Sequence, residues 1–190
     1  NIELKGFLAG ALSKISKSLV NNSSFDIVSF VITAMAEAIA RFIEKELLLG
    51  TTDKIEGLSK IKNVVKAQAA TEITVDDLID LQEEIPDVFQ GNCIWIMNRK
   101  TRKAIRKLKD KEGRYILNPD PTSKWGYTLL GKDVYTSDNM PEMAASAKAI
   151  FYGDMTGIAV KVSEQQSIEV LREKFATQHA IGVVAWIEMD

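Results

Sequence analysis

The chain has 190 residues, 46% of them hydrophobic and 26% charged, which is typical of a globular protein with a buried core. Its formal net charge of −2 argues against a protein whose whole surface binds nucleic acid. The single cysteine, Cys93, excludes an internal disulfide, and with the single histidine, His179, it excludes a zinc site built from Cys and His.

The first long element that the sequence predicts is a helix over residues 24–49. Ser23 or Ser24 is the expected N-cap, and Asp26 then falls in the first turn, where a carboxylate suits the helix dipole. Gly50 fits the position just past the end. The first half of this helix is apolar nearly all round, which predicts packing on several sides.

Within this helix, residues 25–43 approach the length of a membrane span. Asp26, Glu37 and Arg41 interrupt the apolar run, and charges are costly in hydrocarbon. We therefore expect a helix buried in protein and no membrane partner.

The next elements are short. Residues 62–68 alternate weakly, as a strand does. Thr74 is expected to open a helix over 75–84, with Asp77 placed as in a capping box, and Pro86 ends it.

A strand followed directly by a helix comes next. Residues 92–97 are rich in β-formers, and Asn98 is expected to cap a helix over 99–109 that ends by Gly113. Residues 118–126 have the composition of a loop.

Short β-rich runs separated by glycine-containing turns fill the remainder of the chain. Strands are expected at 127–136 around a Gly131-Lys132 turn, at 148–162 around a Gly153-Asp154 turn, and at 180–189. Residues 167–178 are ambiguous, because propensity alone allows a helix there. Helices and strands are mixed without a βαβ period, so the predicted fold class is α+β.

No catalytic, cofactor or metal site is predicted. The sequence has no GxxxxGK[ST] or GxGxxG motif, and His179 is a lone histidine near the border of a strand. Carboxylates are abundant, but no spacing singles out a pair for catalysis. We expect no enzyme activity, no cofactor and no small-molecule substrate.

The charge pattern is the most informative feature. Residues 67–97 contain seven acids and no Lys or Arg, whereas residues 98–114 contain nine Lys and Arg and only two acids. Three interpretations are open: a helix that simply faces water, a nucleic-acid surface, or pairing between an acidic face of one copy and a basic face of the next. The candidate contact residues are Asp76, Asp77, Asp80, Glu83, Glu84, Arg99, Arg102, Lys103, Arg106 and Lys107.

Several segments resemble, in order, the major capsid proteins of tailed bacteriophages with the Hong Kong 97-type fold. The stretch CIWIMNRKTRKAIRKLKDKEGRYIL at residues 93–117 resembles a signature of that family. LLGKDVYTSDNMP and AIFYGDMTG are similar to its following turn and hairpin, and residues 14–50 are similar to its stretch leading into a long spine helix. Asp133 stands where the family often has Pro.

The resemblance implies an organisation in two domains. The spine helix 24–49 would belong to a peripheral domain formed by residues 13–66 and 148–190, and residues 67–147 would form an inserted axial domain. Residues 1–12 would be the remnant of an N-terminal arm and extended loop, in a chain that starts with Asn rather than Met. The resemblance also implies strand for much of 167–178.

The function that the resemblance implies is that of a major capsid protein of a tailed phage or prophage. Such a subunit assembles with itself, as pentamers and hexamers, into an icosahedral shell and encloses DNA without sequence specificity. It would be made in the bacterial host cytoplasm and reside in the virion capsid. Two alternatives stay open: an encapsulin-like cage, and a nucleic-acid-binding regulator that uses the basic helix at 98–114.

Overall fold

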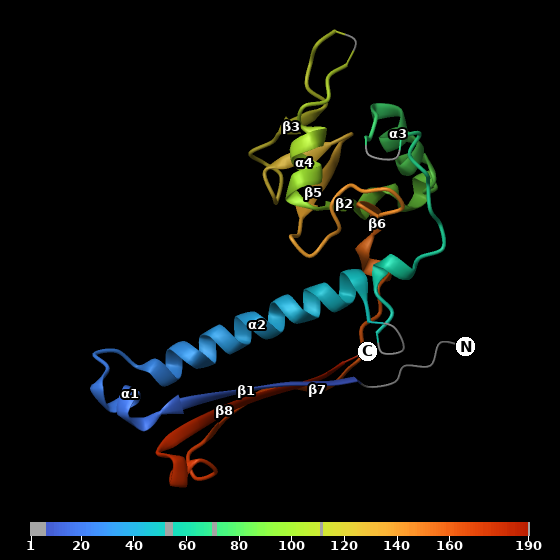
Figure 1. Ribbon diagram of the computed structural model, residues 1–190. Helices are drawn as coiled ribbons and strands as arrows, with labels where there is room; N and C mark the ends of the chain where they lie inside the picture. The colour runs from blue at the N-terminus through green and yellow to red at the C-terminus, as the bar shows by residue number, and fades with distance from the viewer. Residues whose placement is uncertain (1–6, 52–54, 70–71, 111, 190) are drawn as a thin grey trace. The chain divides into compact units, whose positions relative to one another are not determined.

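The computed structural model describes residues 7–51, 55–69, 72–110 and 112–189, and the chain divides into two compact units. Unit 1 comprises Asn1–Glu56 and Val160–Asp190, and unit 2 is the intervening Gly57–Ala159. The inserted domain expected over 67–147 lies inside unit 2, which extends past that range at both ends. Both units combine helices with a sheet, so the predicted α+β class is confirmed (Figure 1).

Unit 1 contains an antiparallel three-stranded sheet in the order β1-β8-β7. The strands are β1 (Phe7–Ser16), β8 (Ala180–Met189) and β7 (Val162–Leu171). β1 and β8 are in continuous register, from Phe7 opposite Met189 to Ser16 opposite Ala180. Of the expected arm remnant, residues 1–6 lie outside the described part, and the remainder belongs to β1 and therefore to the sheet.

The long helix α2 (Ile27–Leu49) follows a short helix, α1 (Lys17–Asn22). Its N-cap is Asp26, whose carboxylate accepts hydrogen bonds from the backbone of Val28 at 3.0 Å and Ser29 at 3.2 Å. The prediction of a serine cap was therefore wrong, because the aspartate reaches the free N–H groups from just outside the helix. Gly50 ends the helix as predicted, with φ of 69° and its N–H bonded to the Glu46 carbonyl.

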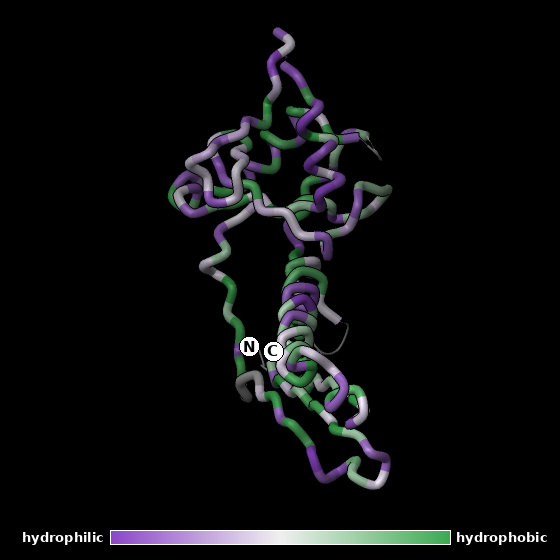
Figure 2. The backbone as a smooth tube through the Cα atoms, turned by 90° about the vertical axis from the view of Figure 1, so that its left-hand side faces the viewer, coloured by the Kyte–Doolittle hydropathy of each residue, from purple (hydrophilic) through white to green (hydrophobic). Residues whose placement is uncertain are grey.

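One face of α2 covers the sheet of unit 1. Ile27, Met35 and Ile39 pack with residues of β1 and β8 in a single buried cluster. The opposite face is open to solvent: Phe30 is 64% exposed, and the charged residues of the helix begin at Glu37, so its most hydrophilic residues lie toward its C-terminal end (Figure 2). The prediction of packing on several sides is thus wrong within unit 1. No helix in the described part of the chain is long and apolar enough to cross a membrane.

Unit 2 is built on a five-stranded sheet with the order β3-β4-β5-β2-β6. The strands are β2 (Cys93–Met97), β3 (Leu117–Pro119), β4 (Tyr127–Leu129), β5 (Lys132–Thr136) and β6 (Ile150–Asp154). The interior strand β2 runs parallel to β5 and antiparallel to β6. Trp95 and Met97 on this strand are fully buried, and the indole N–H of Trp95 donates to the Leu129 carbonyl at 2.9 Å.

Two short α-helices accompany this sheet, α3 (Val75–Glu83) and α4 (Arg99–Ile105). Four 3-10 turns complete the described elements: η1 (Leu58–Lys60), η2 (Asp87–Asn92) and η3 (Met155–Gly157) in unit 2, and η4 (Ala176–Gln178) in unit 1. The predicted helix 99–109 is too long, because the chain turns after Ile105 and Lys109 forms an antiparallel bridge with Tyr115.

Other departures concern strand pairing. Residues 62–68 are irregular rather than a strand. Residues 148–162 are not a hairpin, because β6 pairs with β2 and the Asp154 side chain then caps η3. The turn between β4 and β5 lies at Leu130-Gly131, one residue earlier than predicted, and both residues have positive φ. Within 167–178, the strand implied by the resemblance is present as far as Leu171.

Candidate subunit-contact surfaces

The acidic helix α3 presents carboxylates along one exposed face. Asp76, Asp80 and Glu83 are all exposed, and their spacing of four and then three residues places them on the same side of a helix. Glu84 caps the C-terminus of α3 and is also exposed. Four of the five predicted acidic residues therefore form one acidic surface, hereafter the acidic face.

Asp77 has a different role. It is only 6% exposed, and its carboxylate accepts hydrogen bonds from the backbone N–H of Thr74 at 2.8 Å and of Gln68 at 3.1 Å. Burial raises the pKa of Asp77, but the bonds from the Thr74 backbone, the Thr74 hydroxyl and Gln68 outweigh burial and hold the pKa below its usual value. Thr74 and Asp77 complete the predicted capping box. The structure thus assigns Asp77 to the cap of α3 rather than to the acidic face.

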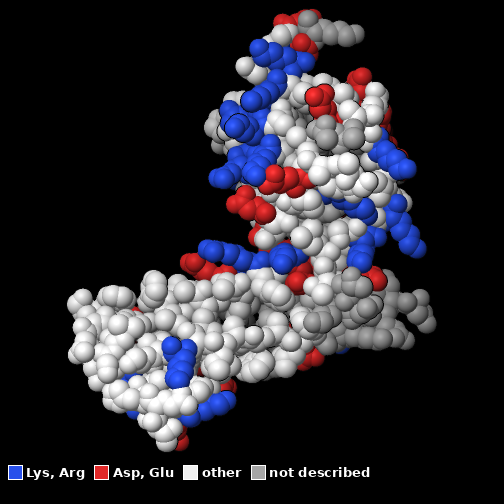
Figure 3. Space-filling view, in the orientation of Figure 1, with Lys and Arg blue, Asp and Glu red and all other residues white. Residues whose placement is uncertain are grey.

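The basic helix α4 is oriented by its polar cap and its buried residues. Asn98 caps it by accepting from the Lys100 N–H at 2.8 Å, and Thr101 and Ile105 point into unit 2, where both are almost fully buried. This orientation leaves Arg99, Lys103, Arg106 and Lys107 exposed, and we call these four residues the basic face. Figure 3 shows Lys and Arg side chains gathered along the side of unit 2 that carries α4.

An aromatic ring supports two of the predicted arginines. The guanidinium of Arg102 lies 4.8 Å from the centre of the Tyr127 ring on β4, and that of Arg106 lies 5.0 Å from it. A guanidinium over an aromatic face is held by cation–π attraction. Arg102 is half-buried in this arrangement, so it contributes to packing as well as to charge.

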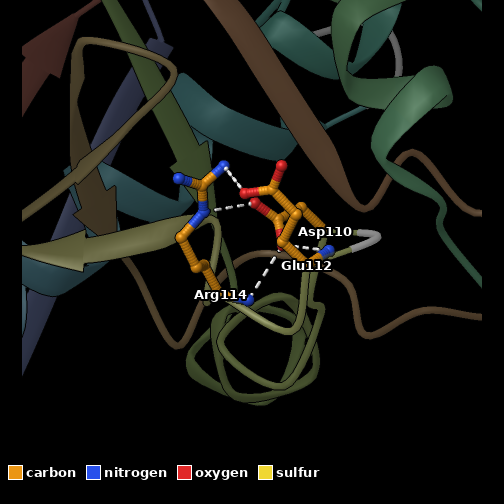
Figure 4. A network of polar contacts seen from close by, with 3 residues as sticks. All are labelled: Asp110, Glu112 and Arg114. Carbon is orange, nitrogen blue, oxygen red and sulfur yellow. Dashed lines mark hydrogen bonds and ion pairs between the residues drawn. The ribbon is translucent and has the colours of Figure 1, made fainter.

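Part of the positive charge of the 98–114 stretch is compensated locally. Lys100 forms an ion pair with Glu142. In the turn after α4, Arg114 binds the Asp110 carboxylate through Nε at 2.9 Å and the Glu112 carboxylate at 2.6 Å (Figure 4). Hydrogen bonds from the Arg114 backbone and side chain lower the pKa of Asp110. Among the described residues, the four members of the basic face have no such carboxylate partner.

The helices α3 and α4 are drawn apart from each other in Figure 1, although Leu78 of α3 and Ile105 of α4 belong to the same buried core of unit 2. Contact with Tyr127 places α4 beside β4, and α3 residues such as Leu81 line a cavity of about 810 Å³ together with β6 residues. No ion pair joins α3 to α4 among the residues that the structure describes. The two charged surfaces therefore do not neutralise each other within one copy.

A further exposed feature lies between α3 and β2 and was missed in the sequence. In the η2 turn, Val88 is 87% exposed and Phe89 is 59% exposed. The signal that could have found them is local: two apolar residues follow Pro86-Asp87 directly after an acidic helix, outside any periodic pattern.

The η2 turn is fixed in place by Gln90. Its side-chain amide donates to the Gln82 carbonyl at 2.7 Å and to the Ile85 carbonyl at 2.8 Å, and its side-chain oxygen accepts from the Tyr152 hydroxyl. Burial, and then the neighbouring Cys93, raises the pKa of Tyr152 to about 12, so its hydroxyl stays protonated and can donate.

The described residues contain no group of His, Cys, Asp and Glu side chains arranged to hold a metal ion. Cys93 is buried, and its thiol donates to the Phe89 carbonyl at 3.1 Å.

Comparison with known proteins finds one family model and several solved structures that resemble this chain. A family model described as the Phage capsid family matches residues 1–190. The chain is similar to the capsid of an empty GTA particle, with 26% identity and a TM-score of 0.83 over 99% of this chain and 69% of that one. No curated protein matches it by sequence.

Two more distant likenesses show the fold alone. A structure from Microbacterium phage Oxtober96 is 15% identical, with a TM-score of 0.72 over 98% of this chain and 66% of that one. The encapsulin of the holo-SrpI complex from Synechococcus elongatus PCC 7942 is 14% identical, with a TM-score of 0.67 over 98% of this chain and 69% of that one.

Proposed function

This chain belongs to the phage capsid family and is a major capsid protein that forms a shell, and we propose that copies meet by setting the acidic face of one unit 2 against the basic face of the next. The match of the family model to the whole chain carries the first statement. The second rests on the two charged faces, which have no ion pair between them among the residues that the structure describes.

A contact between two different faces is heterologous, so each copy offers one face forward and one backward. Repetition of such a contact closes into a ring when the rotation allows it, which suits the pentamers and hexamers of an icosahedral shell. In this proposal unit 2 is the axial domain that gathers around the symmetry axes, and unit 1, with the spine helix α2, is the peripheral domain. Exposed ion pairs contribute up to about 1 kcal/mol each, and they mainly set orientation and partner choice.

The content of the shell is proposed to be DNA, held without sequence specificity, and its location the capsid of a virion assembled in a bacterial host. The encapsulin likeness supports one alternative, a cage for protein cargo. Purified particles from the complete gene product separate the two. After external nuclease treatment, protected DNA supports the phage shell, and particles that hold protein without nucleic acid overturn it.

Charge reversal tests the contact itself. The variant Lys103→Glu/Lys107→Glu changes two exposed residues of the basic face and keeps the contact between Arg102 and the Tyr127 ring. Replacing attraction by repulsion at each contact is expected to raise the concentration needed for assembly about tenfold or more at low salt, and less in high salt, where charges are screened. Light scattering and sedimentation of the complete gene product measure this.

A matched control and a rescue complete the experiment. Lys60→Glu/Lys62→Glu makes the same change in net charge at two exposed residues that do not belong to the basic face. This control variant is expected to assemble normally. Adding Asp80→Lys/Glu83→Lys to the basic-face variant is expected to restore assembly. Normal assembly of the basic-face variant at low salt would refute the proposed pairing.

A further inference from the structure

The most exposed large apolar side chain among the described residues is Val88, and its neighbour Phe89 is also mostly exposed. Single apolar residues at a surface are ordinary, so exposure alone does not indicate a binding site. Two adjacent ones on a turn form a small apolar projection that water solvates poorly. The question is whether the protein could bury them by a local rearrangement.

The structure holds this projection outward. Phe89 N–H donates to the Pro86 carbonyl at 2.9 Å, and the two carbonyls at the end of α3 are bound by the Gln90 side chain. Cys93 binds the Phe89 carbonyl from the strand side, and Lys132 binds the Gln90 carbonyl. Turning Val88 and Phe89 inward would break several of these bonds. A rigid apolar projection loses little conformational entropy on binding, which favours affinity.

The surroundings of the projection indicate what it would bind. Glu83, Glu84 and Asp87 flank it in the sequence and are exposed, and Lys132, which binds the Gln90 carbonyl, is a basic side chain at the turn. A partner must therefore be basic at its rim and apolar within. The α4 side of unit 2 has this composition, because the guanidinium groups of Arg102 and Arg106 lie beside the half-buried Tyr127 ring. The alkyl stems of arginine and lysine also present apolar surface beside their charges.

We infer that Val88 and Phe89 are the apolar anchor of the contact between copies, and that they bind against α4 and Tyr127 of a second copy of this chain. This inference rests on the proposed pairing and adds to it the residues that supply affinity. Buried apolar and aromatic side chains near the centre of an interface commonly dominate its stability, while charged residues at the rim steer association.

Substitution of Phe89 provides the first test, in the complete gene product. Phe89→Ser is expected to raise the concentration needed for assembly about tenfold or more in both low and high salt, since apolar contact is not screened by ions. Phe89→Leu keeps an apolar side chain and is the matched control, expected to assemble within about threefold of the parent. Urea unfolding of each variant checks that the fold is retained.

The outcomes separate the anchor from the charge pairing. If Phe89→Ser assembles normally while Lys103→Glu/Lys107→Glu does not, the anchor is refuted and the pairing stands. If both variants assemble normally, both ideas fail. If Phe89→Ser alone is impaired, the projection binds something other than α4, and the inference is equally overturned.

Covalent trapping provides the second test, and it reports the partner directly. In assembled particles, Val88→Cys combined with Lys107→Cys is expected to give a ladder of disulfide-linked chains on a non-reducing gel, whereas either single variant gives none. Buried Cys93 is present in all three proteins, so any cross-linking through Cys93 would appear equally in the single variants. Well-formed particles without a ladder would overturn the assignment of α4 as the partner surface.

Discussion

Asn98 joins the end of β2 to α4 and to the loop between β5 and β6, so its removal tests how the basic face is positioned. Its side-chain oxygen accepts from the Lys100 N–H at 2.8 Å, and its amide donates to the Met140 carbonyl at 2.8 Å, with only 7% of the residue exposed. Asn98→Ala removes a helix cap worth about 1 kcal/mol. It also removes the donor from a buried carbonyl, at a further cost of about 1–3 kcal/mol. The expected loss of unfolding free energy is about 2–4 kcal/mol.

Urea unfolding followed by tryptophan fluorescence measures this loss. Trp186 belongs to unit 1, so a Trp186→Phe background leaves Trp95 and Trp125 to report on unit 2 alone. Asn98→Ser is the control, because a serine retains the cap but is too short to reach Met140, and an intermediate loss is expected. A loss below about 0.5 kcal/mol for Asn98→Ala would refute the reasoning, since surface changes commonly fall in that range.

Two further predictions concern the acidic cap and a turn. Because the pKa of Asp77 is lowered in the folded state, its stabilisation is present above about pH 4 and is lost as the pH falls through the folded-state value. In urea unfolding between pH 3 and pH 7, Asp77→Asn should therefore be less stable at pH 7 and converge on the parent at low pH; a constant difference would contradict this. Gly131 has φ of 77° with no atom near the Cβ position, so Gly131→Ala should cost about 1 kcal/mol through backbone strain alone. Gly157→Ala, equally open but without positive φ, is the control and should cost nothing; equal effects would refute the strain argument.

Features encoded by a few neighbouring residues could be read from the sequence. Gly50, the Thr74–Asp77 capping box and the Asn98 cap were all predicted and are all confirmed, because each depends on backbone groups within three or four residues. The strand Cys93–Met97 was equally evident, since a fully buried strand is a continuous apolar run. Local chemistry was sufficient for these elements.

Features that depend on distant residues could not be read in the same way. The partner of β6 is β2, more than fifty residues earlier, and nothing in the local sequence distinguishes this pairing from a hairpin. The open face of α2 is another case, because an apolar sequence does not reveal how many of its sides are covered within one copy. For the contact surfaces, sequence identified the charged residues, but only the structure separated the capping Asp77 from the exposed acids and revealed Val88 and Phe89.

The placement of charge also bears on which kind of symmetry the protein can adopt. In a two-fold contact centred on one of these faces, that face meets itself in the second copy, so α4 would face α4, or α3 would face α3, and like charges would repel. A head-to-tail contact sets the acidic face of one copy against the basic face of the next, and so brings unlike charges together. The Val88–Phe89 turn adjoins α3, so a two-fold contact through it would also bring Glu83 and Glu84 of both copies together. The same residues that favour assembly into rings therefore disfavour closed dimers of unit 2.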